Sequence, residues 1–466
     1  MNTQNTETSA AATATTNATS TTATSATNTA TTSATTPLAV GIDRISFATP
    51  HYYLNLEELA EHRGIDPNKF TIGIGQSEQS VPPNHQDIVT LAAQAALPLL
   101  PHIDSNRLKM LIVGTESGVD ASKSSALYVQ NLLKLTPWVR SIEVKEACYG
   151  GTAALMIACD YVRAHAEKNP QVLVIAADIA RYGLATPGEV TQGAGAVAML
   201  VSANPHVLEI NDDSVVKSAD IQDFWRPVYQ DTALARGKFS TEQYIQFFCD
   251  VWQKYCAQNG CNFNDFAGLC FHLPYTKMGL KALKAAMDSC SDSCDNTYDN
   301  TCANSCADSC DNSCDNSNLS ESSRNRLLSR YETSTKYSRR VGNIYTGSLY
   351  LGLLSLLELD EFTCENSDLT ALKSGDKIGL FSYGSGAVGE FFSGTIAPGF
   401  RDALFAREHA DMLDSRVRLS VADYEEMFES VAPYAPEDFE SSTSCREGAN
   451  FFLDAITSQE RHYSAR

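Results

Sequence analysis

A cysteine stands at the junction between a strand-like stretch and a helix-like stretch. The residues up to Ala147 alternate between apolar and polar, as in a strand, and those after Gly151 are small or apolar almost all round, as in a buried helix. Free N–H groups at the start of such a helix favour a thiolate at Cys148, and Gly150 and Gly151 leave room for a substrate. The pattern predicts a covalent nucleophile, although a cysteine beside glycines can also serve packing alone.

Three other polar residues occupy comparable positions. Glu116 follows the strand predicted at 109–114, His272 follows the strand predicted at 268–271, and Asn343 precedes an apolar helix that runs to about residue 359. In a duplicated α/β fold such ends converge where the halves meet. Each residue also has a plainer interpretation, because Glu116 could cap a segment, His272 could be a core histidine and Asn343 could be an N-cap.

Together these side chains could form a carbon–carbon bond. A thiolate can take an acyl group from a thioester at little thermodynamic cost, because one thioester replaces another. A carboxylate such as Glu116, with its pKa raised toward neutrality by burial, could then remove a proton from the carbon beside the acyl carbonyl. His272 and Asn343 could hydrogen-bond a second carbonyl and polarise it for attack.

The elements that position these residues repeat along the chain. Strands are predicted at 40–47, 109–114, 172–177 and 194–201, with helices at 55–62 and 87–100, which indicates an α/β domain. Gly193 lies 45 residues after Cys148, and Gly384 lies 41 residues after Asn343 in a similar glycine-rich pair of strands. We therefore predict a duplicated α/β core with mixed sheets between helix layers, divided into halves at 38–204 and 205–466.

Composition limits the class of protein. The chain has 466 residues, 43% of them hydrophobic and 20% charged, with a net charge of −21. This balance argues against nucleic acid and anionic membranes as partners, although a few lysines could still hold an anionic ligand. No apolar run approaches the roughly 20 residues that span a bilayer. Fourteen cysteines without a secretory signal indicate a reduced, cytoplasmic protein.

Two segments lack the composition of a folded core. Residues 1–37 are mostly Thr, Ala, Ser and Asn, and we expect a disordered tail. Residues 288–318 repeat Cys, Asp, Asn and Ser, with cysteines at 290, 294, 302, 306, 310 and 314. We expect a disordered insertion there, and metal binding or redox pairing stays open. Beyond Thr395 we expect helices that cover the second half, one of them capped by Ser420 and Asp423.

Four motifs in order carry a resemblance to a known family. They are Glu-Ala-Cys-Tyr-Gly-Gly-Thr-Ala-Ala at 146–154, Phe-His-Leu-Pro-Tyr-Thr-Lys-Met-Gly at 271–279, Gly-Asn-Ile-Tyr-Thr-Gly-Ser-Leu-Tyr-Leu-Gly at 342–352 and Phe-Ser-Tyr-Gly-Ser-Gly at 381–386. From residue 38 onward, apart from the insertion, the chain resembles hydroxymethylglutaryl-CoA synthase, most closely the bacterial enzymes of the mevalonate pathway. The resemblance implies a thiolase-like fold, a homodimer, and condensation of acetyl-CoA with acetoacetyl-CoA and water, without metal or organic cofactor.

The resemblance also implies roles for individual residues. Cys148 would be acetylated, Glu116 would deprotonate the acetyl methyl and later protonate the new alkoxide, and His272 would orient the ketone. Asn343 and Ser385 match acyl contacts, with the N–H groups of Ser385 and Cys148 as oxyanion donors. The remaining matches are lysines that bind CoA and other substrate contacts: Lys277 and Lys281, then Asp66, Lys69, Thr191 and Ser240.

The pattern departs from the family at 229–237, where Tyr-Pro and Asp-Gly are usual. Three rivals stay open. One is a β-branching synthase that takes its ketoacyl group from a carrier protein. A ketoacyl synthase with Cys, His and Asn is another, although it would leave Glu116 without a role. The last is a metal-buffering or redox scaffold whose function lies in the cysteine repeat.

Overall fold

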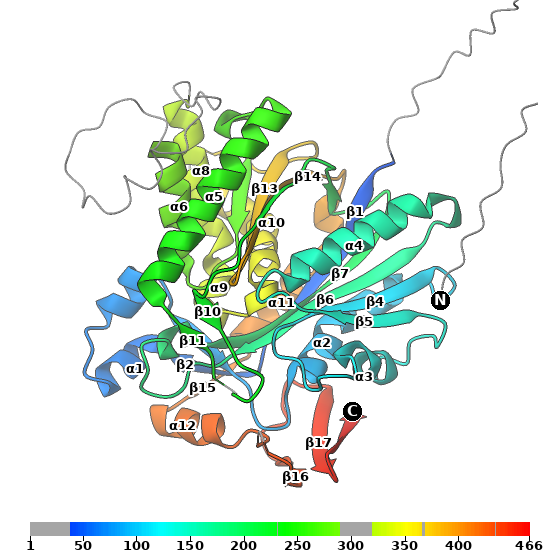
Figure 1. The fold of residues 1–466 in the computed structure, drawn as a ribbon, viewed down its shortest axis with the longest axis vertical. Helices are drawn as coiled ribbons and strands as arrows, with labels where there is room; N and C mark the ends of the chain where they lie inside the picture. The colour runs from blue at the N-terminus through cyan, green and yellow to red at the C-terminus, as the bar shows by residue number, and fades with distance from the viewer. Residues whose placement is uncertain (1–37, 231, 289–318, 366–368, 434) are drawn as a thin grey trace, which may run out of the picture. The chain divides into compact units, whose positions relative to one another are not determined.

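The computed structural model describes residues 38–230, 232–288, 319–365, 369–433 and 435–466 (Figure 1). The predicted disordered tail lies outside these ranges. So does the predicted insertion, apart from Asp288, which is the last residue of a helix. Residues 38–466 belong to one compact unit. Within the described ranges, no helix is long and apolar enough to cross a membrane.

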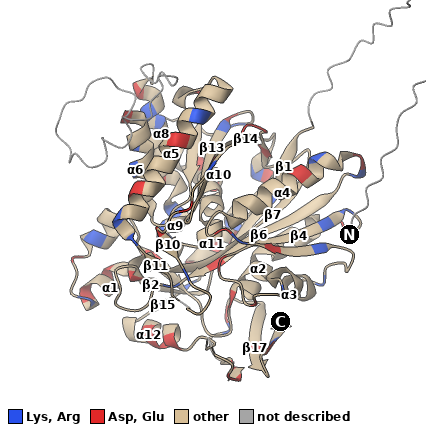
Figure 2. Cartoon of the chain, viewed as in Figure 1, with Lys and Arg blue, Asp and Glu red and all other residues tan. Residues whose placement is uncertain are grey.

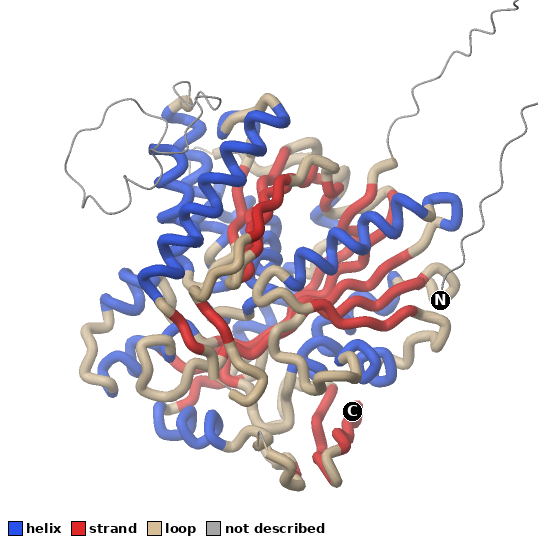
Figure 3. The backbone as a smooth tube through the Cα atoms, in the orientation of Figure 1, coloured by secondary structure: helices blue, strands red, loops and turns tan. Residues whose placement is uncertain are grey.

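A ten-stranded sheet runs through the described chain in the order β12-β13-β14-β8-β1-β7-β6-β4-β5, with β9 paired to β14. Its strands are β1 (Val40–Ala48), β4 (Leu108–Gly114), β5 (Arg140–Val144), β6 (Gln171–Ala180), β7 (Gly193–Ala203), β8 (Leu208–Ile210), β9 (Val215–Ser218), β12 (Gly268–Phe271), β13 (Lys377–Gly384) and β14 (Val388–Ile396). Figure 3 shows these strands in red between the helices. The charged residues lie mainly on helices and loops (Figure 2).

The order of the strands shows the duplication. In the first half, β4 is parallel to β6, which is antiparallel to β7, which is antiparallel to β1. In the second half, β12 is parallel to β13, which is antiparallel to β14, which is antiparallel to β8. The halves join where β1 pairs with β8, so the predicted sheets are one continuous sheet. Among the described strands, β5 has no counterpart in the second half.

Helices form layers on the faces of this sheet. They are α1 (Leu56–His62), α2 (Ile88–Ala96), α3 (Ser125–Leu132), α4 (Gly150–Ala164), α5 (Gly237–Asn259), α6 (Thr276–Asp288), α8 (Glu321–Ser334), α9 (Lys336–Val341), α10 (Ser348–Cys364), α11 (Ala406–Asp414) and α12 (Val421–Glu429). α4 and α10, the helices that follow the predicted turns at Cys148 and Asn343, share one hydrophobic cluster in the middle of the molecule.

Alternate residues of each central strand enter different hydrophobic layers. On β6, Val174 faces the layer of α4 and α10, whereas Ile175 faces the layer of α2. On β13, Leu380 faces the central layer, whereas Phe381 faces the layer of α5 and α6. The central helices α4 and α10 therefore lie between the two halves of the one sheet, and a further helix layer packs on the other face of each half. This arrangement confirms the predicted α/β class and duplicated core.

Smaller sheets surround the core. β2 (Tyr52–Asn55), β3 (Glu78–Val81) and β15 (Val417–Leu419) form one; β10 (Phe224–Trp225) and β11 (Leu234–Ala235) form a hairpin; and β16 (Phe439–Glu440), β17 (Phe451–Thr457) and β18 (Glu460–Ala465) form a third.

The prediction for the chain beyond Thr395 was wrong in two respects. Helices α11 and α12 are present, but β15 to β18 are strands. β17 and β18 pair through a tight turn at Ser458 and Gln459, both with positive φ. The predicted cap is present, since Ser420 accepts the N–H of Asp423 at the start of α12. However, α12 packs with residues of β2, α1 and Val190, so it covers the first half.

Candidate active site

Cys148 lies in a tight turn between β5 and α4, as predicted. Ala147, just before it, has a φ of 40°, which turns the chain sharply. Gly151 and Gly384 allow the second half to approach this turn. A Cβ on Gly151 would lie 2.6 Å from the carbonyl oxygen of Thr346, and a Cβ on Gly384 would lie 2.7 Å from the N of Tyr149. The end of β13 and the turn after Asn343 therefore pack directly against the cysteine turn.

Glu116 and Cys148 are in direct contact. The Cys148 thiol donates a hydrogen bond of 3.0 Å to Oε1 of Glu116. Although part of Glu116 is accessible, its carboxyl group lies deep among protein atoms, and this desolvation, with the nearby charge of Asp178, raises the pKa of Glu116 to about 8. A carboxyl group with a pKa near neutrality can both accept and donate a proton under ordinary conditions.

The state of the cysteine differs from the prediction. Burial, followed by the charge of Glu116 and the hydrogen bond to it, raises the pKa of Cys148 well above its ordinary value. α4 begins at Gly150, and the charges that act on the sulfur are those of the carboxylates of Glu116, Asp178 and Asp223. The resting side chain is therefore a thiol, and its proton has a ready acceptor in Glu116.

Asp178, on β6, holds the parts of the site together. Its Oδ1 accepts the N–H groups of Glu116 (2.9 Å) and Ser117 (3.0 Å) and the hydroxyl of Thr115. Its Oδ2 accepts the N–H of Thr346 at 3.0 Å and the hydroxyl of that residue. The sequence analysis missed Asp178. Its signal was a single charge inside an otherwise apolar strand.

His272 lies at the end of β12 and is 2% exposed. Its N–H donates to the carbonyl of Phe381 (2.8 Å), and its carbonyl accepts the hydroxyl of Tyr244 (2.6 Å). Burial lowers the pKa of His272 to about 3, so its imidazole is neutral, and Nδ1 has no hydrogen-bond partner among the described residues. Among the described residues, no hydrogen bond joins His272 to Cys148; the two are linked through β13, which pairs with β12 and packs on the cysteine turn.

Asn343 is also buried, and its Oδ1 accepts the N–H of Tyr345 (2.9 Å) and the hydroxyl of Ser348 (2.9 Å). Tyr345, Tyr182 and Phe224 pack around Cys148, with ring centroids 5.9 to 6.2 Å apart. Tyr182 and Phe224 were not singled out by the sequence, because aromatic residues are common in cores.

Three of the predicted substrate contacts, Thr191, Ser385 and Ser240, are linked to the turns that carry Asn343 and Cys148. The carbonyl of Thr191 accepts the N–H of Asn343 (3.3 Å). Ser385 lies between Gly384 and Gly386, in the turn that packs on residues 146–149. Ser240, on α5, donates to Oδ2 of Asp223 (3.3 Å), which also accepts the hydroxyl of Tyr383, while Oδ1 accepts the N–H of Gly386. Asp223 thus ties Ser240 to the turn of Ser385.

The other four predicted contacts form a separate group near the start of α6. Thr276 donates to the carbonyl of Gly75 (2.7 Å), which joins α6 to the helical turn at Lys69–Ile74. Lys277 forms an ion pair with Glu332 (3.8 Å), and Lys281 donates to the hydroxyl of Tyr275 (3.3 Å). Asp66 and Lys69 are exposed, and the N–H of Lys69 donates to the carbonyl of Asp66 (2.9 Å). Within the described ranges, no hydrogen bond or ion pair joins this group to Cys148.

The segment at 229–237, which departs from the family pattern, includes β11 and the start of α5. The hairpin that contains it places the guanidinium of Arg226 on the carbonyl of Glu116, while Val228 and Tyr229 are 82% and 77% exposed. Among the described residues, no group of three or more His, Cys, Asp or Glu could hold a metal ion.

Comparison with known proteins supports one family. The family models of the N-terminal and C-terminal parts of hydroxymethylglutaryl-coenzyme A synthase match residues 36–206 and 216–466. Hydroxymethylglutaryl-CoA synthase of Enterococcus faecalis is 44% identical over 91% of this chain and 100% of its own. The polyketide biosynthesis 3-hydroxy-3-methylglutaryl-ACP synthase PksG of Bacillus subtilis is more distant, at 28% identity over 91% of this chain and 99% of its own.

Solved structures agree with this assignment. A crystal structure of HMG-CoA synthase complexed with CoA covers 92% of this chain and 100% of its own, with 40% identity and a TM-score of 0.80. MvaS in complex with 3-hydroxy-3-methylglutaryl coenzyme A covers 92% and 99%, with 35% identity and a TM-score of 0.76. The chain therefore belongs to the hydroxymethylglutaryl-CoA synthase family.

Proposed function

We propose that this protein condenses acetyl-CoA with acetoacetyl-CoA and water to give hydroxymethylglutaryl-CoA and free CoA, in the mevalonate pathway. The observation that carries the proposal is the contact between the Cys148 thiol and Glu116, whose pKa is raised to about 8. This pair can supply a nucleophile and then a base at one point in the molecule. The family to which the chain belongs supports the same reaction.

The first half-reaction acetylates Cys148. Glu116 takes the thiol proton, and the sulfur attacks the carbonyl carbon of acetyl-CoA to form a tetrahedral oxyanion. N–H groups of Cys148 and Ser385 stabilise this oxyanion. The bond from carbon to the CoA sulfur then breaks, and the CoA thiolate takes the proton that Glu116 had accepted. Glu116 is thereby a carboxylate again, and one thioester has replaced another.

The second half-reaction forms the carbon–carbon bond. Glu116, as carboxylate, removes a proton from the acetyl methyl group, and the resulting carbanion attacks the ketone carbon of acetoacetyl-CoA. His272 and Asn343 hydrogen-bond the ketone oxygen, and their neutrality suits this role because neither adds a charge to the buried site. Glu116 returns a proton to the new alkoxide, and water then hydrolyses the thioester to Cys148. Thiol, carboxylate, imidazole and amide supply every step, so the proposed reaction needs no metal or organic cofactor.

The remaining predicted contacts bind the rest of the substrates. Lys277, Lys281 and Lys69 lie around the start of α6, where their positive charge suits the phosphates of CoA. Asp66 lies beside Lys69, while Thr191 and Ser240 contribute to the walls near Asn343 and Ser385. These assignments rest on the motif match and on the positions of the residues.

We also propose a homodimer in the cytoplasm. Strand β5 pairs with β4 on one edge, and no other described strand covers its second edge. Trp138, just before β5, is 87% exposed. A second copy of β5 could extend the sheet across a twofold axis. No disulfide joins the eight described cysteines, which is compatible with a reducing compartment. Sedimentation at micromolar concentration should show a dimer that Trp138→Asp weakens, and a wild-type monomer would contradict the proposal.

The test of the reaction separates its two halves. Intact mass after mixing with acetyl-CoA alone should show one added acetyl group on the wild type and none on Cys148→Ala. Addition of acetoacetyl-CoA to the acetylated wild type should then give turnover. Turnover only with an acetoacetyl group on a carrier protein would favour the β-branching reaction of the more distant relative. The absence of any acetyl adduct would refute the covalent mechanism. The cysteine repeat at 289–318 lies outside the described residues, and its deletion should leave turnover intact.

A further inference from the structure

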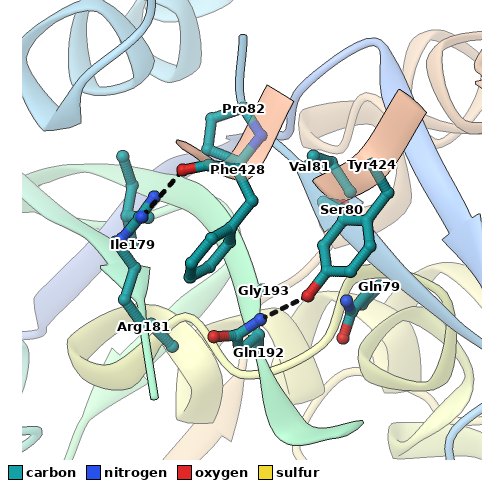
Figure 4. A pocket seen from close by; sticks show the side chains of 11 residues that line it. Gln79, Ser80, Val81, Pro82, Ile179, Arg181, Gln192, Gly193, Tyr424 and Phe428 are labelled. Atoms are coloured by element: carbon teal, nitrogen blue, oxygen red, sulfur yellow. Dashed lines mark hydrogen bonds between the residues drawn. The ribbon is translucent and has the colours of Figure 1, made fainter. Parts of the chain in front are cut away.

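The C-terminal helix α12 is hydrogen-bonded to the loop that leaves β6. Gln192 Nε2 donates to the hydroxyl of Tyr424 (2.9 Å), and that hydroxyl donates to Oε1 of Glu189 (3.1 Å). At the other end of α12, Arg181 donates to the carbonyl of Phe428 (2.8 Å), and its guanidinium lies 3.7 Å from the centre of the Phe428 ring. Figure 4 shows both contacts across a small pocket between α12 and the loop. The loop is thus held from outside the core.

Gln192 also holds the loop from within. Its Oε1 accepts the N–H of Tyr182 (2.8 Å) and the N–H of Gly183 (3.2 Å). β6 has ended at Ala180, so these N–H groups have left the sheet, and the side chain of Gln192 replaces a strand partner. Gln192 is 4% exposed, and so water has little access to take over these hydrogen bonds if the side chain is removed.

Tyr182 carries this restraint to the site. Its ring packs against Phe224 and Tyr345 beside Cys148, and the N–H of Tyr345 donates to Oδ1 of Asn343 (2.9 Å). One continuous path therefore runs from Tyr424 on α12 through Gln192, Tyr182 and Tyr345 to Asn343.

We propose that Gln192 and Tyr424 are positioning residues for the condensation step: through the main chain of Tyr182, they hold the aromatic wall and the amide of Asn343 where the ketone is polarised. The inference deepens the proposed function and rests on it. Both side chains act through the main chain of Tyr182, so they are positioning residues and not catalytic ones. The helix α12, distant in sequence from the other site residues, becomes part of what shapes the acyl pocket.

The effect should fall on turnover more than on binding. CoA recognition is assigned to the charged side chains around α6, whereas the hydrogen bonds of Gln192 and Tyr424 lead to Glu189 and to the main chain of Tyr182. Displacing Asn343 weakens a hydrogen bond that strengthens as charge develops on the ketone oxygen, and an interaction made mainly in the transition state lowers kcat without raising KM. Acetylation of Cys148 depends on Glu116, which is held by Asp178 instead.

The experiment compares four variants with the wild type. Gln192→Leu keeps the size of the side chain and removes its polar atoms, Gln192→Glu keeps an acceptor for the two N–H groups, and Tyr424→Phe removes only the hydroxyl. Tyr255→Phe is the matched control, because Tyr255 is equally buried and also donates to a carboxylate, on Asp213, in the layer of α5. The measurements are kcat and KM for acetoacetyl-CoA, the rate of acetylation by intact mass, and the unfolding temperature.

We expect Gln192→Leu to lower kcat roughly tenfold or more, with KM and acetylation within about twofold of the wild type. Tyr424→Phe should lower kcat about threefold, and Gln192→Glu should retain more activity than Gln192→Leu. Tyr255→Phe should lower the unfolding temperature while kcat stays unchanged. Wild-type kcat in Gln192→Leu, or a loss no larger than that of Tyr255→Phe at equal unfolding temperature, would overturn the inference. A wild type that makes no hydroxymethylglutaryl-CoA would instead refute the proposed function.

Discussion

The turn before α4 and the turn before α10 occupy equivalent places in the two halves, yet they differ in charge. The first carries Cys148 in contact with Glu116, which follows β4. The second carries Asn343, and its counterpart of Glu116 is His272, which follows β12. One half presents groups that exchange protons, and the other presents groups that stay neutral.

Burial produces both behaviours. It raises the pKa of Glu116 to about 8 and lowers the pKa of His272 to about 3, because desolvation disfavours the charged form of either group. With its pKa raised, the carboxyl group of Glu116 can act as an acid and a base near neutral pH. With its pKa lowered, the imidazole of His272 stays neutral there and can serve as a hydrogen-bond donor. Duplicated geometry with different side chains therefore yields a reacting half and an orienting half.

Substitution of the residues at the two turns, Cys148 and Asn343, should have the largest effect on turnover. Cys148→Ala should show no acetyl adduct and lose at least about 10⁴-fold in kcat, because the covalent route is removed. Asn343→Ala should still acetylate fully, while its condensation slows by roughly 10² or more. Intact mass and steady-state turnover measure the two halves separately. Failure of Asn343→Ala to acetylate would mean that the second turn also serves the first half-reaction.

Removal of the base should come next. Glu116→Gln keeps the size of the side chain but cannot take a proton, and condensation should fall roughly 10²- to 10⁴-fold. In the wild type, condensation from the preformed acetyl-enzyme should rise with pH as Glu116 loses its proton, with a midpoint near 8. A rate that does not change between pH 6 and 9 would remove Glu116 from this role. His272→Ala should lower the rate without moving this midpoint.

Asp178→Asn tests the link between the halves. The carboxylate accepts hydrogen bonds from both, and the substitution places an NH₂ group against donors, which should cost about 1–3 kcal/mol of unfolding free energy. The charge of Asp178 also raises the pKa of Glu116, so the midpoint of the pH profile should move to lower pH. Denaturant unfolding and the pH profile report the two effects. An unchanged midpoint would mean that burial alone sets the pKa of Glu116.

Stability should respond to pH in opposite directions at the two residues. Glu116 keeps its proton in the native state when the unfolded chain has lost it, so its contribution falls as pH rises from about 4.5 to about 8. His272 stays neutral in the native state, so its contribution is lost as pH falls from about 6.5 toward 3. Compared with the wild type, Glu116→Gln should lose less stability between pH 5 and 8, and His272→Gln should lose less between pH 6.5 and 4.5. Equal pH dependence in wild type and variants would contradict the assignment.

The smallest effect should come from the group around α6. Lys281→Ala should raise KM for CoA thioesters about two- to fivefold with kcat unchanged, because an exposed lysine contributes binding energy that is the same in the ground and transition states. Lys284→Ala, one turn further along α6 and also exposed, is the control. Equal changes in both variants would indicate a general effect of charge on the helix.

Much of this fold was readable from local pattern. The sequence predicted strands at the positions of β1, β4, β6 and β7, and the similar spacing of glycines after Cys148 and Asn343 predicted the duplication. The prediction for the C-terminal part was wrong because the turn between β17 and β18 is formed by Ser458 and Gln459, which lack the usual Asn-Gly signal of a hairpin. The prediction of a thiolate at Cys148 was wrong. The start of a helix can be recognised from neighbouring residues in the sequence, whereas the carboxylates and the burial that raise the pKa of Cys148 come from distant parts of the chain.

By itself, the sequence determined which residues could react and that they lie at the ends of strands or the starts of helices, because side-chain chemistry and periodicity are local properties. Only the tertiary structure decided the contact of Cys148 with Glu116, the bridging by Asp178, and the path from Tyr424 through Gln192 to Tyr182. It also decided the direction of each pKa shift. Desolvation and hydrogen bonds depend on neighbours that packing brings together from positions far apart in the chain.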